Sequence, residues 1–355
     1  MKMSREQLWQ ILQNAGVTQG ALPAATELES PWYVRTLLGF SGWLASLFLL
    51  GFIGGAFVFV IESNVASISL GGIMIAAAYS VLRLPKNEFF QHLALAVSLA
   101  GQMLITKGIV DIVGGSEAGG YALVAVMQTA LAIIMPNFVH RVFSSFIASF
   151  AFALTLYELK LPFLFSGVVM LLAAWLWLNE FKFPQHLKKV HAIAYGLTLG
   201  LISLKGTALY GWWLMHSRAN FDQKLWIQPW MGELLATVVL LYVVYALMVR
   251  RGFNISHGLT IVTLTCTAVV GVASIKATGI STGIMLMVLG FAASNRVLLG
   301  LGITSLLFFI SSYYYLQDAT LLVKSIRLFS IGVILLVARW VMLRLMPATA
   351  EARDE

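Results

Sequence analysis

Residues 161–178 read LPFLFSGVVMLLAAWLWL, a stretch without a charged side chain. A transmembrane helix needs about 20 mostly apolar residues to cross the hydrocarbon core of a bilayer. The apolar residues here are continuous and do not alternate with polar ones, as they would in a strand of a membrane barrel. The stretch therefore predicts a membrane-spanning α-helix.

The composition of the whole chain supports the same interpretation. Of the 355 residues, 59% are apolar and 11% are charged, and the mean hydropathy is +0.87. Soluble domains have about 45–50% apolar and about 25% charged residues. A soluble fold of this size has too little interior for so much apolar surface, which excludes a cytosolic or secreted globular protein.

We therefore predict an all-α fold, a polytopic bundle of about twelve transmembrane helices. The bundle occupies residues 37–345, between an N-terminal segment (1–36) with a short amphipathic helix and a C-terminal tail (346–355). The two shortest spans, 259–274 and 280–294, are either separate tilted helices or a re-entrant pair. The predicted spans cover residues 37–61, 65–82, 89–109, 119–139, 142–158, 161–178, 190–210, 231–249, 259–274, 280–294, 297–315 and 328–345.

The basic residues indicate the orientation of the bundle. Every second connection carries Lys or Arg near the end of a span, as at Arg83, Arg141, Lys188, Arg250 and Arg296. Connections on the cytoplasmic side of a membrane are enriched in these residues. We therefore expect both end segments to lie in the cytoplasm. This topology also explains the net charge of +8, which gives no reason to expect a nucleic-acid partner.

Ionisable side chains near the spans are candidate functional residues, because a charge in hydrocarbon is expensive. Lys107 and Asp111 are four residues apart on one helix face near the predicted outer end, where they can form an ion pair. Asp318 and Lys324 lie between the last two spans. We expect Lys324 to be held by a carboxylate, with Asp318 favoured, or by carbonyl groups at a helix end. Snorkelling of each cation to the interface is the plainer alternative.

Arg339 lies inside the last predicted span, about 16 Å from its start at residue 328 for a rise of 1.5 Å per residue. Its guanidinium cannot lose its charge in a protein. Because Arg344 already supplies a cation at the inner end, topology does not require a second one. We expect Arg339 to face the bundle in a structural role, with snorkelling as the alternative.

Other polar residues near the spans are weaker candidates. Lys205 lies near the outer end of the span 190–210. We expect it to snorkel or to form a local ion pair, with a polar outward-facing cavity as the alternative. Gln102 and Gln128 lie in the middle of their spans, where they can form hydrogen bonds between helices.

Motifs of known chemistry do not occur in the sequence. The phosphate-binding pattern GxxxxGK[ST], the metal-binding pattern HExxH and the nucleophile pattern GxSxG are absent. Cys266 is the one cysteine, and the histidines have no spacing typical of a metal site. We expect neither a cofactor nor a metal, and the sequence assigns no catalytic residue.

Several stretches resemble a known family. Residues 30–35 read SPWYVR, and residues 294–302 read SNRVLLGLG, followed by three tyrosines at 313–315 and by Arg339 with Trp340. From about residue 30 onward the chain resembles domain-of-unknown-function family 4401. The resemblance implies a multi-pass protein of the bacterial inner membrane. It also implies partners among neighbouring membrane proteins of the same operon, one of them named for a GDYXXLXY motif, and it implies no known activity.

Two classes of function remain open. The lack of a sizeable soluble domain favours a non-enzymatic role within the bilayer, as a transporter-like permease or as a subunit of a membrane complex. The alternative is an intramembrane enzyme that acts on a lipid or a lipid-linked substrate. A polar site in mid-membrane would favour transport, whereas carboxylates converging at an interface would favour an enzyme. On the predicted outer face Glu62, Glu117 and Glu158 have no recognisable spacing.

Overall fold

The computed structural model describes most of the predicted bundle. The predicted first span, 37–61, lies largely outside the described residues, as do Asp318 and the tail 346–355. Within the described residues the secondary structure is helical, with no strand. These residues are 5–16, 62–84, 88–114, 117–210, 229–253, 258–275, 277–316 and 320–345, with isolated positions between 34 and 55.

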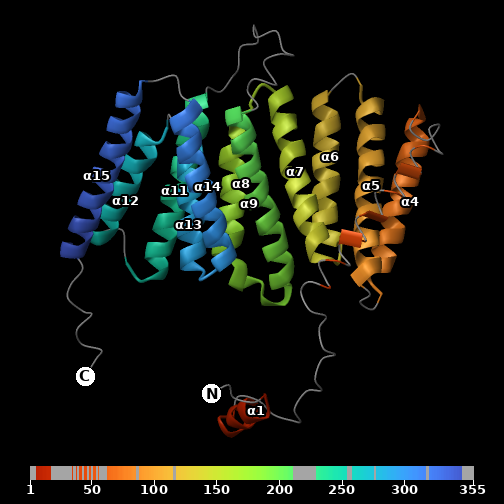
Figure 1. Cartoon of the computed structure of the whole chain (residues 1–355), viewed down its shortest axis with the longest axis horizontal. Coiled ribbons are helices and arrows are strands. Elements are labelled where there is room, and N and C mark those ends of the chain that lie inside the picture. The colour runs from red at the N-terminus through yellow and green to blue at the C-terminus, as the bar shows by residue number, and fades with distance from the viewer. Residues whose placement is uncertain are drawn as a thin grey trace.

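The helices stand side by side in an elongated row, from α4 at one edge to α15 at the other (Figure 1). A short helix in the N-terminal segment, α1 (Arg5–Asn14), lies apart from the row. The row consists of α4 (Asn64–Leu82), α5 (Glu88–Ile112), α6 (Glu117–Ile134), α7 (Phe138–Glu158), α8 (Leu164–Leu178), α9 (Leu187–Tyr210), α11 (Pro229–Arg250), α12 (Gly258–Ala273), α13 (Ile280–Ala292), α14 (Arg296–Leu316) and α15 (Leu321–Leu345).

The lengths and composition of these helices are those of a membrane-embedded protein. In the described part of the chain, seven helices are long and apolar enough to cross a bilayer, namely α4, α5, α6, α7, α9, α11 and α14. Three others, α8, α12 and α13, are apolar but shorter. The all-α class predicted from the sequence is therefore confirmed, and seven of the described helices are candidate membrane spans.

The centre of the row holds the largest cluster of buried apolar side chains. It is built by α8, α9, α11, α13 and α14, and includes Met170, Leu201, Leu240 and Leu286. Without a strong hydrophobic force between helices in lipid, close packing over small residues holds such helices together. Gly290 and Gly302 serve this purpose between α13 and α14, since a Cβ on either would lie 2.4 Å from a backbone nitrogen of the other helix.

The helices α12 and α13 correspond to the two shortest predicted spans. The helix α12 packs against α11 and α15, whereas α13 packs against α14, α11 and α8. Both helices contact α11, but in the described residues they do not pack along each other as a closed hairpin.

The helices alternate in direction, so that α7 and α9 start at the same end of the row (Figure 1). Two 3-10 turns, η1 (Glu180–Lys182) and η2 (Pro184–His186), lead into α9 at this end, which we call the turn end. The helix α1 and the last turn of α15 lie on the same side. The end of α9 and the starts of α11 and α13 lie toward the opposite end.

Candidate functional site

A buried ion pair links α9 to α11. Lys205 Nζ lies 2.5 Å from Glu233 Oε1, and the two side chains are only 2% and 6% exposed. Lys205 lies five residues before the end of α9, and Glu233 lies in the first turns of α11. Charges are rare inside membrane bundles and are paired there, because an unpaired charge is expensive. This pair is therefore the leading candidate for a functional site.

The start of α13 completes this site. The backbone nitrogen of Gly279 lies 3.5 Å from the second carboxylate oxygen of Glu233, Oε2. Gly279 immediately precedes α13 and has a φ of +92°, a left-handed conformation that glycine adopts without a steric penalty. The start of a helix carries a partial positive charge that attracts carboxylates. We call Lys205, Glu233 and the Gly279 amide the charged centre.

The short length of α13 places its start inside the bundle. The helix α13 has 13 residues and α14 has 21, so their lengths are about 20 Å and about 31 Å. Because Ala293–Asn295 join them in a tight turn, α13 starts about 12 Å short of the far end of α14. Gly279 accordingly lies against the ring of Phe309, well before the end of α14. In the first turn of α13 the buried hydroxyl of Ser281 has no hydrogen-bond partner among the described residues.

Lys107 and Asp111 form the ion pair expected from their spacing. Lys107 Nζ lies 2.8 Å from Asp111 Oδ2 and donates to Asn64 Oδ1 at 3.4 Å, which connects α5 to the start of α4. The side chains are 34% and 44% exposed. Pairs as exposed as this one contribute little to stability.

Lys324 is buried at the start of α15. Its Nζ donates to the carbonyl oxygen of Tyr314 at 2.6 Å and lies 5.7 Å from the centre of the Tyr314 ring. Tyr314 belongs to the last turn of α14. Of the partners foreseen for Lys324, the structure shows the helix-end carbonyl, and Asp318 lies outside the described residues.

The expectation that Arg339 faces the bundle is wrong, since the structure leaves Arg339 exposed. The reason is the length of α15, which begins at Leu321 and not at residue 328. Arg339 therefore lies about 27 Å from the start of its helix instead of about 16 Å, and only about 9 Å from the end at Leu345, at 1.5 Å per residue. From that depth a long cationic side chain reaches the interface by snorkelling.

A second buried polar cluster joins α5 to α7. His140 is fully buried, and its Nε2 lies 2.8 Å from Ser98 Oγ and 3.0 Å from the amide nitrogen of Gln102. The other ring nitrogen, Nδ1, lies 3.2 Å from Ser144 Oγ. Gln102 thus makes the bond between helices that its mid-span position predicts. The side-chain carbonyl of Gln128 has no partner in the described part of the chain.

The carboxyl groups of Glu117 and Glu158 also lie near each other, although their spacing in the sequence did not predict this. Glu158, at the end of α7, lies close enough to Glu117, at the start of α6, for the two carboxyl groups to interact. Both lie at the end of the row opposite the turn end.

Sequence reasoning missed Glu233 and treated Lys205 as interfacial. One signal was available, because Glu233 is the only acid within the apolar run 231–249. An ionisable residue in such a run is a functional candidate by default.

Comparisons with known proteins identify a family. A family model described as Domain of unknown function (DUF4401) matches residues 31–345, nearly the whole chain. Neither the curated proteins nor the solved structures include a match to the chain.

Proposed function

The chain belongs to the DUF4401 family, and we propose that it works as a transporter-like permease that carries a small anion together with a proton. The observation that carries this proposal is the buried pair Lys205–Glu233 at the start of the short helix α13. Helices that start inside the membrane, with their positive ends directed at anionic groups, are a recurring feature of transporter binding sites.

The charged centre suggests how an anion and a proton would be coupled. The Glu233 carboxylate occupies the place where a helix start and a lysine attract an anion. When Glu233 takes up a proton, a substrate anion replaces it beside Lys205 and the Gly279 amide. For a singly charged anion, the charge of the site is then unchanged, because the one proton on Glu233 compensates the one negative charge that enters. Because an uncompensated buried charge is expensive, neither event occurs readily without the other.

Uptake of protons into liposomes tests this proposal. The purified protein is reconstituted with an entrapped pH-sensitive dye, and an inward gradient of succinate, phosphate or chloride is applied. We expect acidification of the interior with at least one of the three anions, and none with Lys205→Gln. Glu233→Gln should stop proton uptake while still exchanging the labelled anion across the membrane.

Lys107→Gln serves as the matched control, because Lys107 belongs to an exposed ion pair outside the charged centre. It should behave as the wild type. The permease proposal fails if none of the three anions acidifies the liposomes beyond protein-free ones, or if Lys205→Gln is as active as the wild type.

A second candidate, an intramembrane enzyme that acts on a lipid, is favoured by the contact of Glu117 with Glu158. Two adjacent carboxyl groups can share acid and base roles when one of them holds a proton. The wild type and Glu158→Gln would be incubated with bacterial lipids, and the products compared by mass spectrometry. An enzyme predicts a lipid of altered mass that forms only with the wild type.

We also propose neighbouring membrane proteins of the same operon as partners. Support comes from α15 at the edge of the row, where Leu336 and Trp340 are exposed beside Arg339. Co-purification with a tagged chain should recover such a neighbour, and Arg339→Glu should reduce the recovery. Arg83→Glu, which changes an exposed arginine at the opposite edge of the row, is the matched control. Recovery of no neighbour would remove this partner from consideration.

A further inference from the structure

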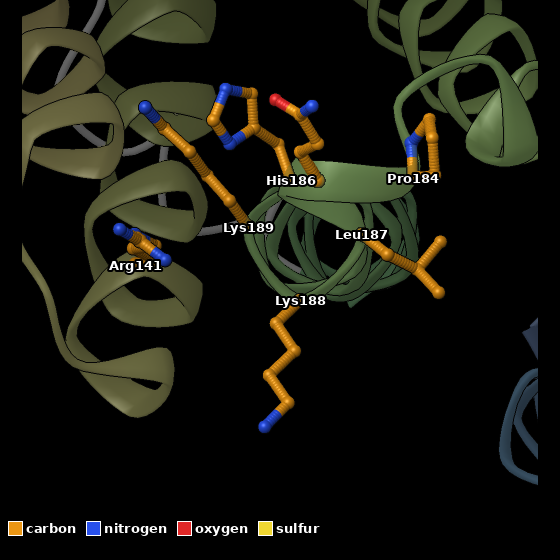
Figure 2. Close-up of a pocket in the computed structure, with 7 residues that line it drawn as sticks. Arg141, Pro184, His186, Leu187, Lys188 and Lys189 are labelled. Atoms are coloured by element: carbon orange, nitrogen blue, oxygen red, sulfur yellow. The ribbon is translucent and has the colours of Figure 1, made fainter. Parts of the chain in front are cut away.

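A cavity of about 570 Å³ lies at the turn end, between the start of α7 and the start of α9. It is lined by Arg141 from α7 and by residues 184–189, which form η2 and the first residues of α9. Figure 2 shows His186 and Lys189 extending toward the side on which Arg141 lies, whereas Lys188 points away from them. Side chains from two separate helices therefore bring positive charge to one cavity.

Among the residues that the structure describes, no acid lines this cavity. The nearest acid along the chain, Glu180, is already bonded to His191, whose Nε2 lies 2.7 Å from Glu180 Oε2. The Nε of Arg141 is buried and has no hydrogen-bond partner among the described residues. A guanidinium keeps its charge and its donors, so this nitrogen requires an acceptor from outside the described part of the protein.

The start of α9 adds electrostatic repulsion to the gathering of cations at this cavity. Lys188 and Lys189 lie in its first turn, which contains no acid. The partial positive charge at a helix start repels cations and attracts anions. A bound anion would offset this repulsion. It would also accept a hydrogen bond from Arg141.

The surroundings of the cavity are apolar. Phe138 and Val139, in the same helical turn as Arg141, are exposed, and so is Phe183, which directly precedes η2. An anion that carries acyl chains can place its charge in the cavity and its chains against these residues. Basic pockets between membrane helices bind phospholipid headgroups in this way.

We propose that this cavity binds a phosphate group, and that the headgroup of an anionic phospholipid supplies it. A free phosphate ion has the same chemistry, and the two sources differ in whether the exposed Phe138, Val139 and Phe183 take part. The site is separate from the charged centre, which lies toward the opposite end of the row.

Binding of phosphatidylglycerol to the full-length protein in phosphatidylcholine nanodiscs tests the proposal. Each cation near a lipid headgroup contributes a factor of about five in affinity. The double variant Arg141→Gln/Lys189→Gln should therefore bind phosphatidylglycerol about thirty-fold more weakly than the wild type. Lys182→Gln is the control, since Lys182 is an exposed cation on the adjacent turn η1 that does not line the cavity, and its affinity should not change.

Thermal unfolding in phosphatidylcholine alone shows whether each variant folds. If the double variant does not fold, Lys189→Gln alone should still lower the affinity about five-fold. The proposal is overturned if the folded variants bind phosphatidylglycerol as tightly as the wild type. It is also overturned if Lys182→Gln loses as much affinity as the variants of the cavity.

Inorganic phosphate distinguishes the two sources. If phosphate neither binds nor displaces phosphatidylglycerol, the lipid is the ligand as proposed. If phosphate alone binds, and binds less well to the double variant, the cavity takes a free phosphate and the lipid assignment is wrong. If neither probe prefers the wild type to the double variant, the cavity binds no phosphate group.

Discussion

Lys205 and Glu233 show where sequence reasoning reaches its limit for a single residue. Both residues can be identified as charges within apolar runs, but their pairing joins α9 to α11 across 28 positions of sequence. Spacing along one helix predicts contacts between residues three or four apart, as at Lys107 and Asp111. It says nothing about contacts between different helices, and for this reason the charged centre had to come from the structure.

Breaking the Lys205–Glu233 pair should be costly. Removing one partner of a buried pair leaves an uncompensated charge, which destabilises a protein by about 3–5 kcal/mol. We expect Lys205→Met or Glu233→Leu alone to lower the free energy of unfolding by about this amount. The double variant Lys205→Met/Glu233→Leu should recover most of the loss, because it leaves no charge behind. Unfolding in detergent measures all three, and a double variant that is less stable than either single variant would contradict the assignment.

Arg339 should tolerate replacement by leucine. Its side chain is exposed and lies near the end of α15, so the substitution removes no buried contact. We expect Arg339→Leu to change the free energy of unfolding by less than about 0.5 kcal/mol, the usual range for surface substitutions. Thermal unfolding beside Arg344→Leu measures the difference. A large loss confined to Arg339→Leu would restore a structural role for this residue.

At the scale of whole helices, the apolar runs predict well which segments are helical, but they predict the residues at which the helices begin and end less accurately. The run 328–345 predicts the last helix, yet α15 begins at Leu321. A hydropathy criterion ends a span at its first charges, here Lys324 and Arg327. The helix continues through them because Lys324 finds an acceptor in the carbonyl of Tyr314. The sequence analysis placed Arg339 by its distance from residue 328. The error in the start of the helix therefore placed Arg339 too deep in the membrane and produced the wrong expectation for it.

Glycine spacing in α14 allows a matched test of the contact between α13 and α14. A Cβ on Gly302 would lie 2.4 Å from the backbone nitrogen of Met287, whereas a Cβ on Gly300 would meet nothing within 4 Å. Gly302→Ala therefore forces the two helices apart, and overpacking of this kind costs about 1–3 kcal/mol. Gly300→Ala should be neutral or slightly stabilising, because alanine is the better helix former. Equal stability of the two variants in thermal unfolding would show that the helices do not approach this closely.

At the scale of the whole molecule, the row of helices has two chemically different ends. The turn end holds Arg141, Lys188 and Lys189 around one cavity. The opposite end holds the contact between Glu117 and Glu158. The alternation of basic connections predicts this asymmetry, but it cannot show that Arg141 and Lys189 share a cavity, since α7 and α9 are brought together only by packing.

The same asymmetry carries a prediction about orientation. Cytoplasmic connections retain Lys and Arg because translocation of these residues is unfavourable. The turn end should therefore face the cytoplasm, together with α1 and the end of α15, which lie on the same side (Figure 1). Fusions of green fluorescent protein after Arg251 and after the last residue should fluoresce, and alkaline phosphatase at these positions should be inactive. Phosphatase inserted between residues 211 and 228, in the connection from α9 to α11, should be active. Active phosphatase after Arg251 would reverse the orientation, and with it the cavity at the start of α9 would face the opposite leaflet.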